Sequence, residues 1–150
     1  MYDVIKYFNK VLPSVAKEAN IGVDSSKGFD GDAWVWIWRT YVGEGTDRCG
    51  AEAIFRAQPD TFYERVTTEV SAHAWKEMLR HVSWSMTYRV QVLEVEDFSA
   101  QAEKLLMPQL SLLLSTAWKE ALRQAGRLGT LQERQEKLQD KLRRQKLMGA

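Results

Sequence analysis

The stretch AWVWIWRTYV, residues 33–42, decides the fold class of this chain. It is rich in β-branched and aromatic residues and too short for a typical helix, so it predicts a β-strand. Successive side chains of a strand point to opposite faces. Trp34, Trp36 and Trp38 therefore share one face, and apolar side chains also occupy the other face. We expect a strand that is covered on both sides.

A glycine-rich segment, GEGTDRCG (residues 43–50), follows the predicted strand. Phosphate-binding loops use glycines to bring backbone N–H groups to an anion at a helix N-terminus. The glycine spacing here does not fit the dinucleotide motif, and Ala51 and Glu52 stand where a P-loop needs Lys and Ser or Thr. We therefore expect a plain turn, after which Asp47 caps a short helix that ends near Gln58.

Further elements are predicted on both sides of this strand. In residues 3–20, apolar side chains recur at the three- and four-residue spacing of a helix, and a wider apolar stripe follows in residues 99–125. The Gly-, Ser- and Asp-rich residues 20–32 are typical of a loop. Residues 84–95 alternate between apolar and polar, which predicts a strand with one core face and one solvated face.

Residues 60–82 allow two interpretations. Their apolar residues fall on two opposite helical faces, so a single straight helix would have to bury both sides. We favour a break near Ser71, with a strand at 61–70 and a helix after it. On one helix, four residues at four-residue spacing could bind a metal or transfer protons. These residues are Glu69, His73, Glu77 and His81. A solvated helix face is the simpler explanation of this stripe.

The C-terminal segment is basic and carries a leucine seam. Residues 119–150 contain nine Lys or Arg and four Asp or Glu, whereas the rest of the chain contains 12 bases and 16 acids. The heptad seam consists of Leu128, Leu131, Gln135, Leu138, Leu142 and Gln145. The basic residues that flank the seam or follow it are Arg127, Arg134, Lys141, Arg143 and Arg144. Like charges beside the seam oppose a parallel homodimer and favour an acidic partner. A helix that packs back on its own domain is the competing explanation.

Together these patterns predict an α+β fold in which helices cover a small antiparallel sheet. We expect a globular domain at residues 1–126 and a long basic helical extension at 127–150. The N-terminus lacks the features of a signal peptide, and no stretch has the roughly 18 apolar residues of a membrane span. Cys49 is the single cysteine, so an intrachain disulfide is excluded. We expect a location in the cytoplasm or within an assembled particle, away from membranes.

These features favour a non-enzymatic structural or assembly subunit of a larger complex, for example a virion component, that acts through protein–protein contacts. The candidate interface comprises the leucine seam and Trp34, Trp36 and Trp38. For these tryptophans a place in the chain's own core is the favoured interpretation, and a protein interface is the second. The expected partners are other protein subunits, through self-association or an acidic helix. Nucleic acid bound by the basic tail is one alternative, and a metal-dependent enzyme using the Glu and His stripe is another. We expect no catalytic residues, metal or cofactor.

Overall fold

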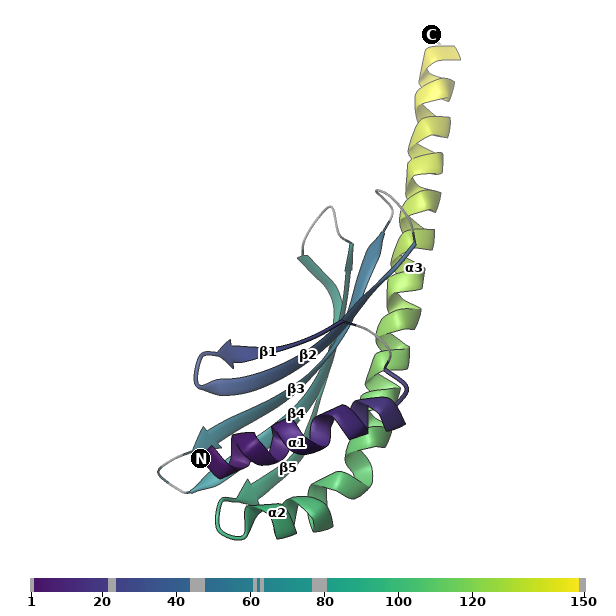
Figure 1. The fold of residues 1–150 in the computed structure, drawn as a ribbon. Helices are drawn as coiled ribbons and strands as arrows, with labels where there is room; N and C mark the ends of the chain where they lie inside the picture. The colour runs from purple at the N-terminus through teal and green to yellow at the C-terminus, as the bar shows by residue number, and fades with distance from the viewer. Residues whose placement is uncertain are drawn as a thin grey trace.

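The computed structural model describes most of the chain (Figure 1). The described residues are 2–21, 24–43, 48–60, 62, 64–76 and 81–148. Their elements are, in chain order, α1 (Tyr2–Glu18), β1 (Asp24–Asp30), β2 (Ala33–Val42), β3 (Cys49–Asp60), β4 (Arg65–Lys76), β5 (His81–Glu94), α2 (Phe98–Gln101), a π-helical turn η2 (Ala102–Leu106) and α3 (Met107–Met148).

The five strands form one antiparallel sheet in which each strand pairs with the next along the chain. The helices α1 and α3 pack on the same face of this sheet (Figure 1). The α+β class and the antiparallel sheet are therefore confirmed. The expected coverage of both faces of the Trp-rich strand holds only for its first half: on the second face Val35 is buried and Ile37 half-buried, but Arg39 and Tyr41 are exposed.

The core lies between the sheet and α3. On β3 every second residue from the start of the strand is buried, namely Cys49, Ala51, Ala53, Phe55 and Ala57. Small alanines on β3 and β4 allow a helix to approach the sheet closely. The apolar stripe of the C-terminal helical region fills this space with Leu106, Leu110, Leu114, Ala117, Trp118, Ala121 and Ala125, all buried. Each buried leucine contributes about 1.5–3 kcal/mol of transfer free energy.

Three segments differ from the expectations. The predicted loop at 20–32 contains β1, which pairs with β2 along its whole length. The short helix expected from Asp47 to about Gln58 is wrong, because β3 occupies Cys49–Asp60. Asp47 and most of the turn predicted at 43–47 lie outside the described residues. The expected break at Ser71 is absent, because β4 continues through it to Lys76. In each case pairing with a neighbouring strand outweighs weak local propensity.

β5 confirms the strand expected at 84–95, but its faces change partway along. The register with β4 shifts between Thr68 and Glu69, which pair with Gln91 and Arg89, so one residue of β5 is extra. Such a bulge reverses which side chains point to the core. Val92, expected on the core face, is 46% exposed, whereas the next residue, Leu93, is fully buried.

The helical region after β5 begins with α2 at Phe98 and widens into η2 directly before Pro108. Proline has no N–H to donate, and the wider turn accommodates this loss. From Met107 the helix α3 continues past Gly126 without interruption. The helix therefore has no break at the expected boundary between residues 126 and 127.

Candidate functional site

The tryptophans of β2 are core residues in the folded chain. Trp36 is 7% exposed and Trp38 is 6% exposed, and both belong to the core cluster. Phe8 of α1 packs edge-on against Trp36 with their ring centroids 5.5 Å apart. Trp34 is partly buried and packs against the same core. An interface role for Trp36 and Trp38 is therefore wrong for this fold, because neither presents a side chain to a partner.

The end of α3, unlike the tryptophans of β2, presents apolar side chains to solvent. Leu128 is half-buried against the core, but Leu138 is 57% exposed and Leu142 is 52% exposed. All described side chains from 138 to 147 are exposed. Figure 1 shows this part of α3 continuing beyond the edge of the sheet. The side chains of Leu131, Arg134 and Gln135 lie outside the described part of the structure.

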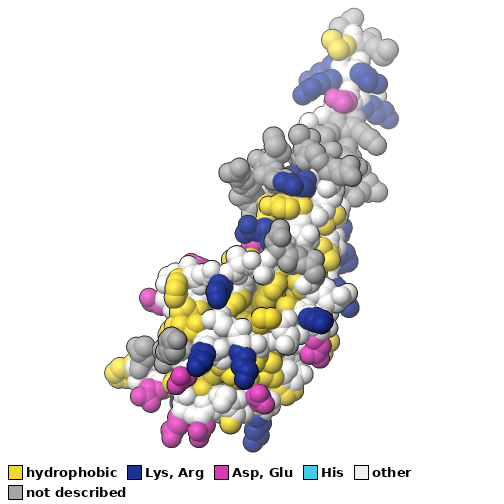
Figure 2. All heavy atoms as spheres, in the orientation of Figure 1, with side chains coloured by type: hydrophobic (Ala, Val, Ile, Leu, Met, Phe, Trp, Pro, Cys, Tyr) yellow, Lys and Arg dark blue, Asp and Glu magenta, His cyan; other side chains and the backbone are white. Residues whose placement is uncertain are grey.

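The exposed end of α3 is strongly cationic. Lys141, Arg143, Arg144 and Lys146 are exposed, and Asp140 is the acid among the described residues 138–147, which leaves a net charge of +3. Figure 2 shows Lys and Arg side chains gathered around the end of the helix. Within the described residues none of the four cations is held in an ion pair. This surface combines apolar side chains with positive charge that is not neutralised locally.

The predicted metal stripe is not on a helix. Glu69 and His73 lie on β4, where a separation of four residues corresponds to about 13 Å. His81 begins β5, with its side chain outside the described part, and Glu77 lies outside the described residues. Among the described residues, no group of three His, Cys, Asp or Glu is placed to hold a metal ion. The helical metal-binding arrangement is therefore wrong.

The strand register instead brings other polar residues together on the face of the sheet that α1 and α3 leave uncovered. A row of directly paired positions crosses four strands through Arg39, Glu52, His73 and Ser85. Arg39 donates two hydrogen bonds to one carboxylate oxygen of Glu52, at 3.0 and 3.1 Å. The guanidinium also lies over the Trp75 ring, 5.4 Å from its centroid. These contacts tie neighbouring strands together.

Two buried polar atoms lack a hydrogen-bond partner within the described part of the chain. They are the Tyr7 hydroxyl and the Nδ1 atom of His73. Burial, with a smaller effect of the Glu103 charge, raises the pKa of Tyr7 above its usual value of 10.0. Tyr7 packs edge-on against Phe8 and Phe98, so its phenol is a core group.

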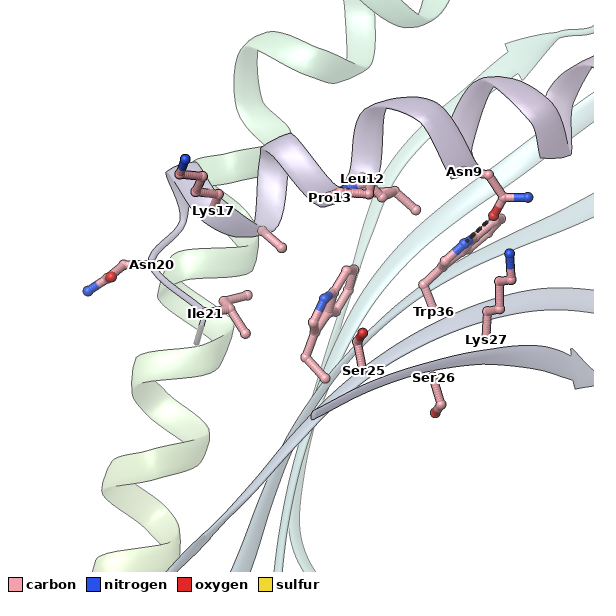
Figure 3. A pocket seen from close by; sticks show the side chains of 12 residues that line it. Asn9, Leu12, Pro13, Lys17, Asn20, Ile21, Ser25, Ser26, Lys27 and Trp36 are labelled. Carbon is pink, nitrogen blue, oxygen red and sulfur yellow. Dashed lines mark hydrogen bonds between the residues drawn. The ribbon is translucent and has the colours of Figure 1, made fainter. Parts of the chain in front are cut away.

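A pocket of about 610 Å³ lies between α1 and the edge of the sheet formed by β1 and β2 (Figure 3). Its lining residues are Asn9, Leu12, Pro13, Ala16, Lys17, Asn20, Ile21, Ser25, Ser26, Lys27, Trp36 and Trp38. Sequence reasoning missed this pocket because residues 20–32 were interpreted as a loop. The alternation of β1, once paired with β2, is the feature that places Ser25 and Lys27 opposite α1.

Comparison of the chain with protein families, with curated proteins and with solved structures found no match. Within the described residues, no helix combines the length and apolar character that a membrane crossing requires. The chemistry of the exposed surfaces therefore carries the functional argument.

Proposed function

We propose that the protein is a non-enzymatic assembly subunit that binds an acidic amphipathic helix of a partner protein through the end of α3. The observation that carries this proposal is the pair of exposed leucines, Leu138 and Leu142, on a cationic helix that extends beyond its own sheet. Apolar side chains at this spacing form the seam along which two helices pack. A seam that begins at Leu128 on the core and ends free in solvent is suited to joining two chains.

The size of the seam is adequate for a specific helix pair. From Leu128 to Gln145 it covers 18 residues, or about 27 Å of helix. Leu138 and Leu142 are each about half exposed, so covering them would contribute about 1 kcal/mol each. Two such leucines correspond to about thirtyfold in affinity. The remaining binding energy would come from the charges beside the seam.

Those charges favour a foreign partner over a second copy. The positions before the seam are Arg127, Arg134 and Lys141, and the positions after it are Gln132, Gln139 and Lys146. In a parallel homodimer these two sets face each other, so bases would meet glutamines or another base. In an antiparallel homodimer the basic set would face itself. Neither arrangement provides an attractive pair, whereas a helix with Glu at its flanking positions would neutralise these cations.

The first test is binding of a synthetic helix of about three heptads with Leu in its seam and Glu beside it. We expect the full chain to bind this peptide in fluorescence anisotropy, and we expect added salt to weaken binding. The Leu138→Ser, Leu142→Ser double variant should weaken binding about thirtyfold. Leu112→Ser is the matched control, because Leu112 is an exposed leucine of α3 outside the seam.

Three outcomes would count against the proposal. Equal binding by the double variant and by Leu112→Ser would place the contact away from the seam. A concentration-dependent dimer in light scattering that the double variant abolishes would identify the partner as a second copy. Binding to duplex DNA, tighter than to the acidic peptide and steeply weakened by salt, would favour nucleic acid.

A further inference from the structure

The pocket beneath α1 is shaped by the way this helix ends. Asn20 adopts a left-handed conformation with φ of 60°. Its N–H donates to the Lys17 carbonyl at 3.1 Å, and the N–H of Ile21 donates to the Ala16 carbonyl at 3.0 Å. This pair of bonds is the Schellman arrangement, which stops a helix and reverses the chain. It brings Ile21 back over the last turn and starts β1 on the opposite side of the pocket.

One end of the pocket is lined mainly by apolar side chains. Leu12 and Pro13 of α1 lie on the helix side (Figure 3), and Ala16 of the same helix also lines the pocket. Trp38 of β2, which pairs with Ser25, lines it from the sheet. Ile21 closes this end next to the end of the helix. Lys17, Asn20 and Ser25 also line the pocket toward this end. The apolar surface that Leu12, Pro13, Ile21 and Trp38 provide suits a hydrocarbon or aromatic body.

The opposite end of the pocket carries donors. The indole N–H of Trp36 donates to Oδ1 of Asn9 at 3.0 Å, which fixes the orientation of the Asn9 amide. The Asn9 NH2 group and the Lys27 ammonium lie at this same end (Figure 3). An oriented amide and an ammonium together can donate hydrogen bonds to both oxygens of a carboxylate.

The charged side chains among the described residues that line the pocket are basic. The described residues that line it include two lysines, Lys17 and Lys27, and no Asp or Glu. Within the described residues neither ammonium is in an ion pair. The C-terminus of α1 carries partial negative charge, so Lys17 in its last turn is favourably placed on the helix itself. Lys27, at the end away from that terminus, is therefore the cation available to an anionic ligand.

We propose that this pocket binds a small amphiphilic carboxylate of the fatty-acid class. The carboxylate would lie against Lys27 and Asn9, and the apolar body would extend toward Ile21 and Trp38. The volume of about 610 Å³ falls within the roughly 300–1,000 Å³ of small-molecule sites. This inference is independent of the partner of α3, because the pocket is formed by α1, β1 and β2.

Decanoate is the probe, titrated calorimetrically into the full chain below the concentration at which it forms micelles. Decanol and decyltrimethylammonium carry the same tail with a neutral and a cationic head. We expect decanoate to bind more tightly than either. Lys27→Gln should weaken decanoate binding about fivefold, because an exposed ion pair is worth about 1 kcal/mol at most. Lys6→Gln, on the exposed surface of α1 outside the pocket, should leave it unchanged.

A pair of substitutions on β1 provides the steric test. Ser25 points toward α1 (Figure 3), whereas Gly28 lies on the other face of the strand and outside the pocket lining. Phenylalanine is well tolerated in strands, so Ser25→Phe should fill the pocket and weaken binding by more than about tenfold. Gly28→Phe is the matched control and should bind as the wild type does, because a Cβ atom at Gly28 meets no atom within 4 Å. In the wild-type chain, decanoate should also shift the NMR signal of the Trp36 indole N–H.

Each opposite result would overturn the proposal. No binding of decanoate, or no shift of the Trp36 signal, would remove the pocket as its site. Equal affinity for decanol would show that the pocket recognises no anion. Equal affinity of the Ser25→Phe and Gly28→Phe variants, with both folded by circular dichroism, would place the binding elsewhere.

Discussion

Replacement of Gly50 by alanine is expected to destabilise the sheet through a steric conflict with Trp75. The two residues are directly paired across β3 and β4 on the uncovered face. A Cβ atom at position 50 would lie 2.3 Å from two carbons of the Trp75 ring and 2.8 Å from its nitrogen. Non-bonded carbons attract at about 3.5–4.0 Å, so the ring would have to move. Its movement would also disturb the Arg39 guanidinium that lies over it.

The magnitude follows from two opposing effects. Alanine is ordinarily favoured over glycine in a strand by about 0.5–1 kcal/mol, because glycine loses more conformational freedom on folding. Overpacking costs about 1–3 kcal/mol. We therefore expect a net loss of about 1–2 kcal/mol in the free energy of unfolding. For a chain of this length, each kcal/mol corresponds to a fall of roughly 2–4 °C in Tm.

The assay is a double-mutant cycle measured by urea unfolding. Gly50→Ala, Trp75→Ala and the double variant are compared with the wild type. Gly50→Ala should destabilise the wild type but be neutral or stabilising once the Trp75 ring is removed. Gly28→Ala is the matched control, because a Cβ atom there meets no atom within 4 Å. The reasoning would be refuted if Gly50→Ala cost the same in both backgrounds, or no more than Gly28→Ala.

Three further predictions concern stability. Thr68→Val keeps the shape of a fully buried side chain but removes a hydroxyl that accepts from the N–H of Gln91 at 3.1 Å and donates to its carbonyl at 2.9 Å. The substitution should therefore lower the free energy of unfolding by about 1–3 kcal/mol and speed hydrogen exchange of the Gln91 amide. Leu114→Ala should cost about 2–5 kcal/mol in urea unfolding, because Leu114 is fully buried between α3 and the sheet; a loss below about 1 kcal/mol would contradict this packing. Hydrogen bonds, first from Arg123, hold the pKa of Glu120 at about 2, below its usual 4.5. The stability that this carboxylate contributes is therefore fully present above the pKa of the unfolded chain, and it is lost as pH falls toward 2. The stability difference between wild type and Glu120→Gln should therefore vanish at low pH, and a Glu120 pKa near 4.5 by NMR would contradict the contact.

The helices and strands that could be predicted from the sequence are those whose apolar residues recur at a spacing typical of only one type of element. β2 was recognised from its β-branched and aromatic content, and the main helices from their apolar stripes. β3 was missed because its core positions are mostly alanines, which favour helices in isolation. For β4 the sequence predicts that the strand ends near Ser71, because the apolar residues beyond Ser71 also fit helical spacing. In both strands, cross-strand pairing and burial decided the structure.

The candidate binding surfaces also differ in how far the sequence predicts them. The leucine seam is visible in the sequence, but its division between a half-buried Leu128 and exposed Leu138 depends on how far the sheet reaches along α3. The α1 pocket could not be predicted, because it requires β1 to pair with β2. The row from Arg39 to Ser85 depends on the register of four strands.

The sequence by itself determined the α+β class, two of the strands and both main helices, and it predicts a leucine seam on the basic C-terminal segment. These features follow from local periodicity and composition, which act over a few residues. Only the tertiary structure decided that Trp36 and Trp38 are core residues, that Val92 and Leu93 exchange faces at a bulge, and that Lys27 lies opposite Asn9. The reason is that strand pairing joins residues far apart in sequence, and a shift of one residue in register reverses the face of every side chain that follows.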